Sequence, residues 1–161
     1  MKALNKKNIT ENFITIMTTI SEDKSEKYIK RKKYYPSKNL IFNELGGILP
    51  STKHLEAFIR KLINKLSMES SHIALSFLYI DLISQKVHIC LQNIMNLIFI
   101  ASLLSVKLLD DEIFHYAYYS NMVGMTQIQL AELECYFLEL LDYELLVSVD
   151  DLTSCLNFLN L

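Results

Sequence analysis

The sequence feature that most constrains the fold is a mostly apolar segment in the second half of the chain, residues 94–106. It contains Asn96 and stops at Lys107, so it is shorter than the ~20 residues that a membrane-spanning helix needs. The segment therefore predicts a buried core helix, over about residues 92–108, that is apolar on every face. A helix of this kind is stable when other helices enclose it.

The composition favours further helices over strands. The chain has 161 residues, of which 51% are hydrophobic, but only 3 are Gly and 2 are Pro. All-β domains need many turns, and turns draw on Gly and Pro. A chain of this length is expected to form one domain, so the sequence predicts a single all-α domain.

Apolar periodicity divides residues 51–161 into consecutive helices with short joints. Before the central helix, one apolar stripe covers residues 55–66 and follows an N-cap at Ser51 or Thr52, and a second covers residues 73–83 and follows Ser70. After it, a fourth helix is expected over roughly residues 111–121, with the acidic run at residues 110–112 stabilising its first turn.

A fifth helix is expected to start at Thr126, because Gln129 follows at capping-box spacing. A final short helix follows Asp150. The sequence thus predicts five helices around the nearly all-apolar third one, in a domain over residues 50–161.

Residues 1–49 are expected to form an N-terminal extension. Ile9, Phe13, Ile16, Met17 and Ile20 have the spacing of a short amphipathic helix. Residues 1–35 carry nine Lys/Arg against four acids, and residues 36–161 carry seven against fourteen. The basic run at residues 27–33 is a solvated arm, a nuclear-import signal or a contact for an acidic partner. We expect residues 1–35 to be dispensable for folding.

Catalytic and cofactor motifs are missing. The sequence has no Gly-rich phosphate loop, no GxSxG, no HExxH and no Cys/His cluster, so we expect no enzyme, no metal and no cofactor. Cys90, Cys135 and Cys155 are widely spaced and are interpreted as reduced core cysteines of an intracellular protein, in the nucleus or cytoplasm. No apolar segment is long enough for a membrane anchor, and the acidic balance of residues 36–161 argues against nucleic-acid binding.

Several ordered motifs resemble the P/U-type cyclins, the group that contains the fungal phosphate-pathway cyclin. Residues 103–111 (L-L-S-V-K-L-L-D-D) resemble the A-x-K-Y/F-L-D-D ending of the third cyclin-box helix, and residues 118–126 (Y-Y-S-N-M-V-G-M-T) resemble Y-A-K-V-G-G-I/V-S/T. Residues 129–134 (Q-L-A-E-L-E) resemble E-L-N-x-L-E, and the 27-residue step from Lys107 to Glu134 fits without a gap. The resemblance covers about residues 50–150 and implies a single five-helix cyclin box.

The resemblance also implies a site and a partner. In cyclins, a Lys/Glu pair on helices three and five grips a cyclin-dependent protein kinase where its regulatory C-helix docks, and the matching residues are Lys107 and Glu134. The implied apolar docking positions are Leu104, Leu108, Leu138, Tyr143 and Leu145.

A second implied pair is structural. Asp81 lies between two apolar residues and needs a basic partner, for which the family position is Lys61 or, in another alignment, Arg60. This ion pair is expected to be internal.

The expected function is therefore that of a cyclin, which activates a cyclin-dependent protein kinase by positioning its C-helix. The alternative is a cyclin-fold or helical adaptor without kinase activation, such as a transcription-related scaffold.

Overall fold

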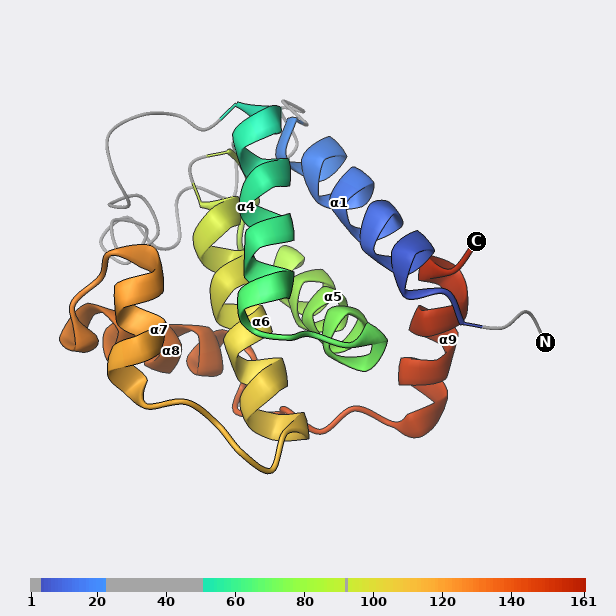
Figure 1. The fold of residues 1–161 in the computed structure, drawn as a ribbon. Coiled ribbons are helices and arrows are strands. Elements are labelled where there is room, and N and C mark those ends of the chain that lie inside the picture. Colours follow the sequence, from blue (N-terminus) through green and yellow to red (C-terminus); the bar gives the residue numbers. More distant parts are fainter. Residues whose placement is uncertain (1–3, 23–50, 92) are drawn as a thin grey trace.

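A computed structural model of the chain describes residues 4–22, 51–91 and 93–161 (Figure 1). These ranges contain helices and no strand, which confirms the prediction of an all-α protein. The basic run at residues 27–33 and the boundary predicted at residues 49 and 50 lie outside the described residues. The helices are α1 (Lys6–Glu22), α4 (Thr52–Lys65), α5 (Ser70–Ser84), α6 (Ile94–Leu109), α7 (Tyr116–Val123), α8 (Gln127–Leu140) and α9 (Val149–Leu159).

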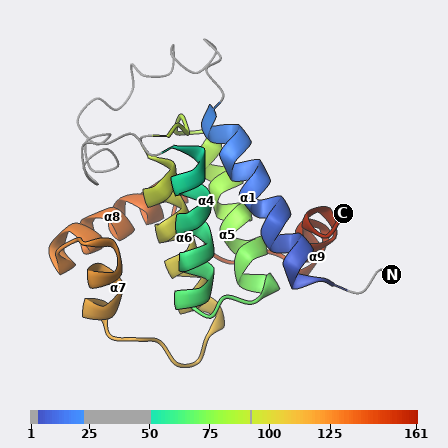
Figure 2. The same cartoon turned by 45° about the horizontal axis from the view of Figure 1, so that its top comes forward.

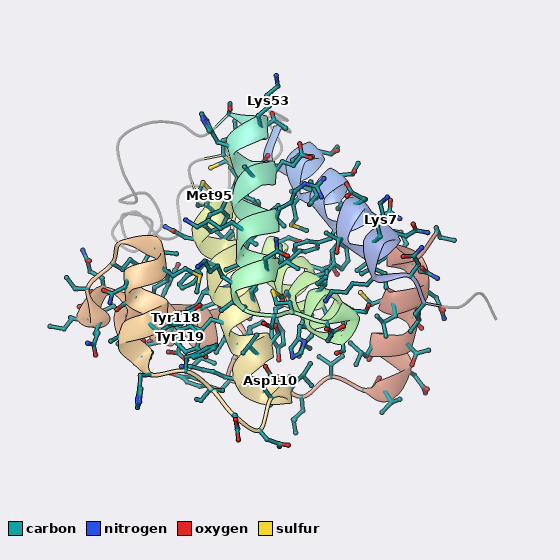
Figure 3. The ribbon with its side chains drawn as sticks, in the orientation of Figure 1. Lys7, Lys53, Met95, Asp110, Tyr118 and Tyr119 are labelled. Atoms are coloured by element: carbon teal, nitrogen blue, oxygen red, sulfur yellow. The ribbon has the colours of Figure 1, made fainter. Side chains whose placement is uncertain are left out.

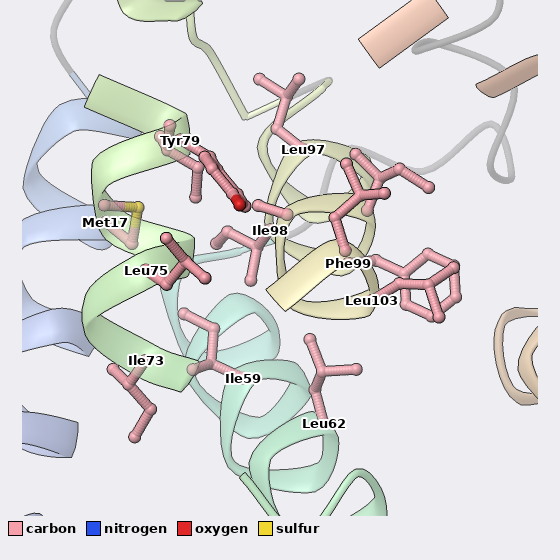
Figure 4. Packing of buried hydrophobic residues seen from close by; sticks show 14 of the residues in the cluster. Met17, Ile59, Leu62, Ile73, Leu75, Tyr79, Leu97, Ile98, Phe99 and Leu103 are labelled. Carbon is pink, nitrogen blue, oxygen red and sulfur yellow. The ribbon is translucent and has the colours of Figure 1, made fainter. Parts of the chain in front are cut away.

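Helix α6 forms the centre of the molecule, because its side chains are apolar on every face. Residues 97–101 are all 0% exposed. In Figure 4, Ile98 of α6 lies next to Leu75 of α5, with Ile59 of α4 close to both, and all three belong to the buried core. Each such side chain contributes roughly 1.5–3 kcal/mol when it leaves water. The helix expected over about residues 92–108 is therefore present and buried, as the apolar segment predicted.

The helices lie on two sides of α6. Figures 1 and 2 both show α7 and α8 on one side, and α1 and α9 on the other side beyond α5. Backbone Asn5 N–H donates to the Asn160 side-chain oxygen at 3.0 Å, and the Asn12 amide donates to the Leu159 carbonyl at 2.9 Å. These bonds join the first described helix to the last.

Helix α1 belongs to the core. Ile9 and Phe13 are 0% and 1% exposed, and Met17 lies beside α5 in Figure 4. The amphipathic spacing correctly predicted a helix here, but the expectation that residues 1–35 are dispensable for folding conflicts with this burial. The positive charge of residues 1–35 suggested an appendage, but α4, α5 and α9 cover the apolar face of α1.

The helix caps differ in part from the predicted ones. The Ser51 hydroxyl accepts from His54 N–H, and Thr126 and Gln129 form the predicted capping box, at 3.1 and 2.9 Å. Helix α5 is capped by Glu69 together with His72, and Ser70 is already helical.

Helix α7 begins later than predicted. It starts at Tyr116, whereas the acidic run at residues 110–112 lies before it. Asp110 caps the end of α6 in an extended conformation, so these carboxylates do not stabilise a helix N-terminus as expected.

Candidate functional site

The two charged residues of the predicted site, Lys107 and Glu134, meet between α6 and α8. Lys107 Nζ lies 2.6 Å from Glu134 Oε1, and their side chains are 24% and 15% exposed. Lys107 stands in the last turn of α6, after the buried residues end, where a cation also favours the helix dipole. The structure thus places a half-buried ion pair at the edge of the core.

A third residue, Tyr116 at the start of α7, completes this polar group. Its hydroxyl donates to Glu134 Oε2 at 3.0 Å, and Lys107 Nζ lies 4.9 Å from the centre of its ring. Burial and, second, the Glu134 charge raise the pKa of the Tyr116 hydroxyl above its usual range. Sequence reasoning missed Tyr116, because no motif or spacing connects it with either charge.

The five apolar positions that the family resemblance implies for the docking site differ in their exposure. Leu104 is buried at 4% exposure, whereas Leu108 is 40% and Tyr143 is 65% exposed. Leu138, one turn after Glu134, is half-buried, and so is Leu145. Of the five apolar positions, Leu104 therefore lies in the core. We call Lys107, Glu134, Leu108, Leu138 and Tyr143 the Lys107–Glu134 surface.

Tyr143 is held outward by an anchored turn that follows α8. Asp142 and Tyr143 have φ angles of 53° and 60°, a left-handed conformation that costs roughly 1–2 kcal/mol per non-glycine residue. Lys86 Nζ donates to the Leu140 carbonyl and to Asp142 Oδ2, both at 2.6 Å. Past the turn, the Tyr79 hydroxyl donates to the Leu145 carbonyl at 2.8 Å. Tyr143 thus projects from a segment that is fixed on both sides.

A buried histidine fixes the end of α6. His72 Nδ1 accepts from Glu69 N–H at 2.9 Å, so the hydrogen of the neutral ring is on Nε2, which donates to Asp110 Oδ1 at 2.9 Å. Lys6 of α1 pairs with Glu69 at 3.0 Å. The last turn of α6, which carries Lys107, is therefore tied to the start of α5.

The expected internal pair of Lys61 and Asp81 is not formed. Both side chains are exposed, and no ion pair joins them among the described residues. The alternative cation, Arg60, donates to both carboxylate oxygens of Glu11, at 2.8 and 2.7 Å, and to Glu56 at 2.9 Å. Arg60 thus pairs with α1 and with its own helix instead of with α5, because α1 packs against α4.

The cysteines differ from the interpretation that all three are core residues. Cys155 is buried, and burial raises the pKa of its thiol to about 11, with the Asp81 charge as a smaller cause. Cys90 is half-buried and Cys135 is exposed. In the described ranges, no group of three or more His, Cys, Asp or Glu residues is arranged to hold a metal ion, and no helix combines the length and apolarity that membrane crossing needs.

The fold and this surface define a class of protein: a small all-α domain built around one enclosed helix. The family model for cyclins matches residues 17–145, which is more than half of the chain. The chain therefore belongs to the cyclin family. A search of curated proteins finds no match.

Proposed function

We propose that the chain binds a cyclin-dependent protein kinase through the Lys107–Glu134 surface and activates it. The single observation that carries this proposal is the 2.6 Å ion pair between α6 and α8, which the exposed Leu108 follows directly in the sequence. Exposed apolar side chains around a polar pair are typical of a surface that a partner covers. Membership of the cyclin family, which is generally regulatory, supports the same conclusion.

We further propose that the chain is a P/U-type cyclin with a single box of five helices, α4 to α8. The motif order at residues 103–134 and the five consecutive helices between Thr52 and Leu140 support this assignment. A regulatory and non-catalytic role inside the cell, in the nucleus or cytoplasm, belongs to the same proposal.

The mechanism is a shift in the conformation of the kinase. Kinases need an ion pair between a strand lysine and a C-helix glutamate before ATP is correctly placed. A partner that binds this active arrangement more tightly than the inactive one moves the population towards it. A shift from 1% to 99% active takes about 5.5 kcal/mol of differential binding.

The test is activation of purified kinase. We expect the chain to raise peptide phosphorylation by at least one cyclin-dependent kinase when a panel of them is assayed one at a time. The matched control carries both Lys107→Glu and Glu134→Lys, which keeps opposite charges side by side but reverses them towards a partner. It should fold and fail to activate. If the parent chain is folded and neither binds nor activates any kinase of the panel, the proposal is wrong and the helical adaptor is favoured.

A further inference from the structure

We propose that Tyr116 is a positioning residue for partner binding: its hydroxyl and ring hold Glu134 and Lys107 as one preorganised unit. This inference rests on the proposed function, because it concerns the same surface. It adds a residue from α7 to a site that the sequence assigned to α6, α8 and the segment after α8.

Three contacts restrain the side chains of Glu134 and Lys107. Glu134 Oε1 is 2.6 Å from Lys107 Nζ, and Glu134 Oε2 accepts from the Tyr116 hydroxyl at 3.0 Å. The Tyr116 ring lies 4.9 Å from Lys107 Nζ, within the range of a cation–π contact. Both carboxylate oxygens and the ammonium are therefore fixed before any partner arrives.

Such restraint matters because Lys and Glu are long side chains with many rotamers. A flexible pair loses that freedom on binding, and the loss weakens affinity. A pair that is already held in place loses less. Glu134 is only 15% exposed, so water does not replace the Tyr116 hydroxyl freely at Oε2.

The neighbouring tyrosines of α7 have other partners. The Tyr118 hydroxyl donates to the Lys65 carbonyl at 3.2 Å, and the Tyr119 hydroxyl accepts from Phe114 N–H at 3.0 Å. Figure 3 labels Tyr118 and Tyr119 next to each other on α7. Among these three tyrosines, Tyr116 alone bonds to the charge pair, which gives a matched control on the same helix.

The first experiment compares Tyr116→Phe with Tyr118→Phe in binding to the kinase that the parent chain activates. Tyr116→Phe keeps the ring over Lys107 and removes the bond to Glu134, so Kd should rise about tenfold. Tyr118→Phe should bind like the parent. The denaturation midpoint of Tyr116→Phe should fall somewhat, because Glu134 Oε2 loses its donor, so affinities are compared under conditions in which all three proteins are fully folded.

The second experiment repeats the change in a Glu134→Ala background, which removes the acceptor of the Tyr116 hydroxyl and makes a double-mutant cycle. If Tyr116 acts through Glu134, Tyr116→Phe should cost little further affinity there. An equal tenfold loss in both backgrounds overturns the inference, even if Tyr116→Phe alone proves unstable. Parent-like binding of Tyr116→Phe overturns it too and leaves the proposed function intact. A parent chain that binds no kinase overturns both.

Discussion

The two sides of α6 differ in how completely the chain covers its own apolar surface. On one side, α1, α5 and α9 pack together, and we call these three helices the closed side. On the other, the last turn of α6, the loop that follows it, α7, α8 and the turn after α8 form the open side. Phe13 and Tyr79 of the closed side are 1% and 0% exposed, whereas Phe114 and Tyr143 of the open side are 55% and 65% exposed.

The polar contacts differ in the same way. The closed side is joined by bonds between residues distant in sequence, such as Asn12 to the Leu159 carbonyl. The open side places the ion pair of Lys107 and Glu134 at the border between core and solvent. Its charge is also one-sided, since residues 108–144 contain no Lys or Arg and eight acidic residues. The difference indicates that the closed side maintains the fold and that the open side is available to a partner.

The largest effect on stability should come from removing a buried side chain of the closed side. Phe13→Ala removes a fully buried ring from α1 and should lower the free energy of unfolding by about 3–5 kcal/mol. Chemical denaturation of the whole chain measures this change. Thr19→Ala, at an exposed position of the same helix, should stay within about 0.5 kcal/mol of the parent. Equal stability of Phe13→Ala and the parent would show that α1 is an appendage and would break the comparison.

A smaller effect is expected on the open side, at the end of α7. Gly124 has a φ angle of 72°, and an added Cβ would meet no atom within 4 Å. The cost of Gly124→Ala is therefore that of the backbone conformation, roughly 1–2 kcal/mol. Gly124→Asn should lose less, because Asn tolerates the left-handed region better. If both variants unfold at the same denaturant concentration as the parent, the turn is not held in this conformation.

The smallest effect is a dependence of stability on pH at the border between α1 and α4. The hydrogen bonds from Arg60 lower the pKa of Glu11 below its usual value of 4.5. Because the pKa is depressed in the folded state, the pair stabilises the fold above pH 4.5 and loses this contribution as the pH falls through the folded value.

Glu11→Gln should therefore lower the melting temperature at pH 7, and the gap to the parent should close as the pH falls from 5 to 3. The gap should be small, since exposed ion pairs contribute little. Glu132→Gln, an exposed position of α8, should show no such trend. A gap for Glu11→Gln that stays constant over this range would exclude the ion pair as its cause.

Much of the fold could be predicted, because its signals are local. The apolar segment that became α6 and the capping box at Thr126 are readable within one helix. The packing of α1 and the late start of α7 depend on contacts between distant segments. The partner of Arg60 illustrates this limit: Glu11 is 49 positions away, and nothing in the α4 sequence distinguishes it from Asp81.

The site was predictable to the extent that a family resemblance fixes spacing. The 27-residue step from Lys107 to Glu134 matched the family motifs, and the structure brings these two side chains together. Tyr116 gave no such signal, because its role depends on the direction in which α7 leaves the loop after α6. The sequence could not show whether Leu104 is buried or exposed, since a leucine at helical spacing is found in both the core and docking surfaces.

The central claim is that Lys107 and Glu134 serve a partner more than they serve the fold. Calorimetric titration of Lys107→Ala and Glu134→Ala with the activated kinase tests it most directly, when unfolding of the same proteins is followed by circular dichroism. The account predicts a loss of roughly 2–5 kcal/mol in binding. It also predicts a change in stability of about 1 kcal/mol or less. Variants that fold and bind like the parent, or that unfold readily, would contradict it.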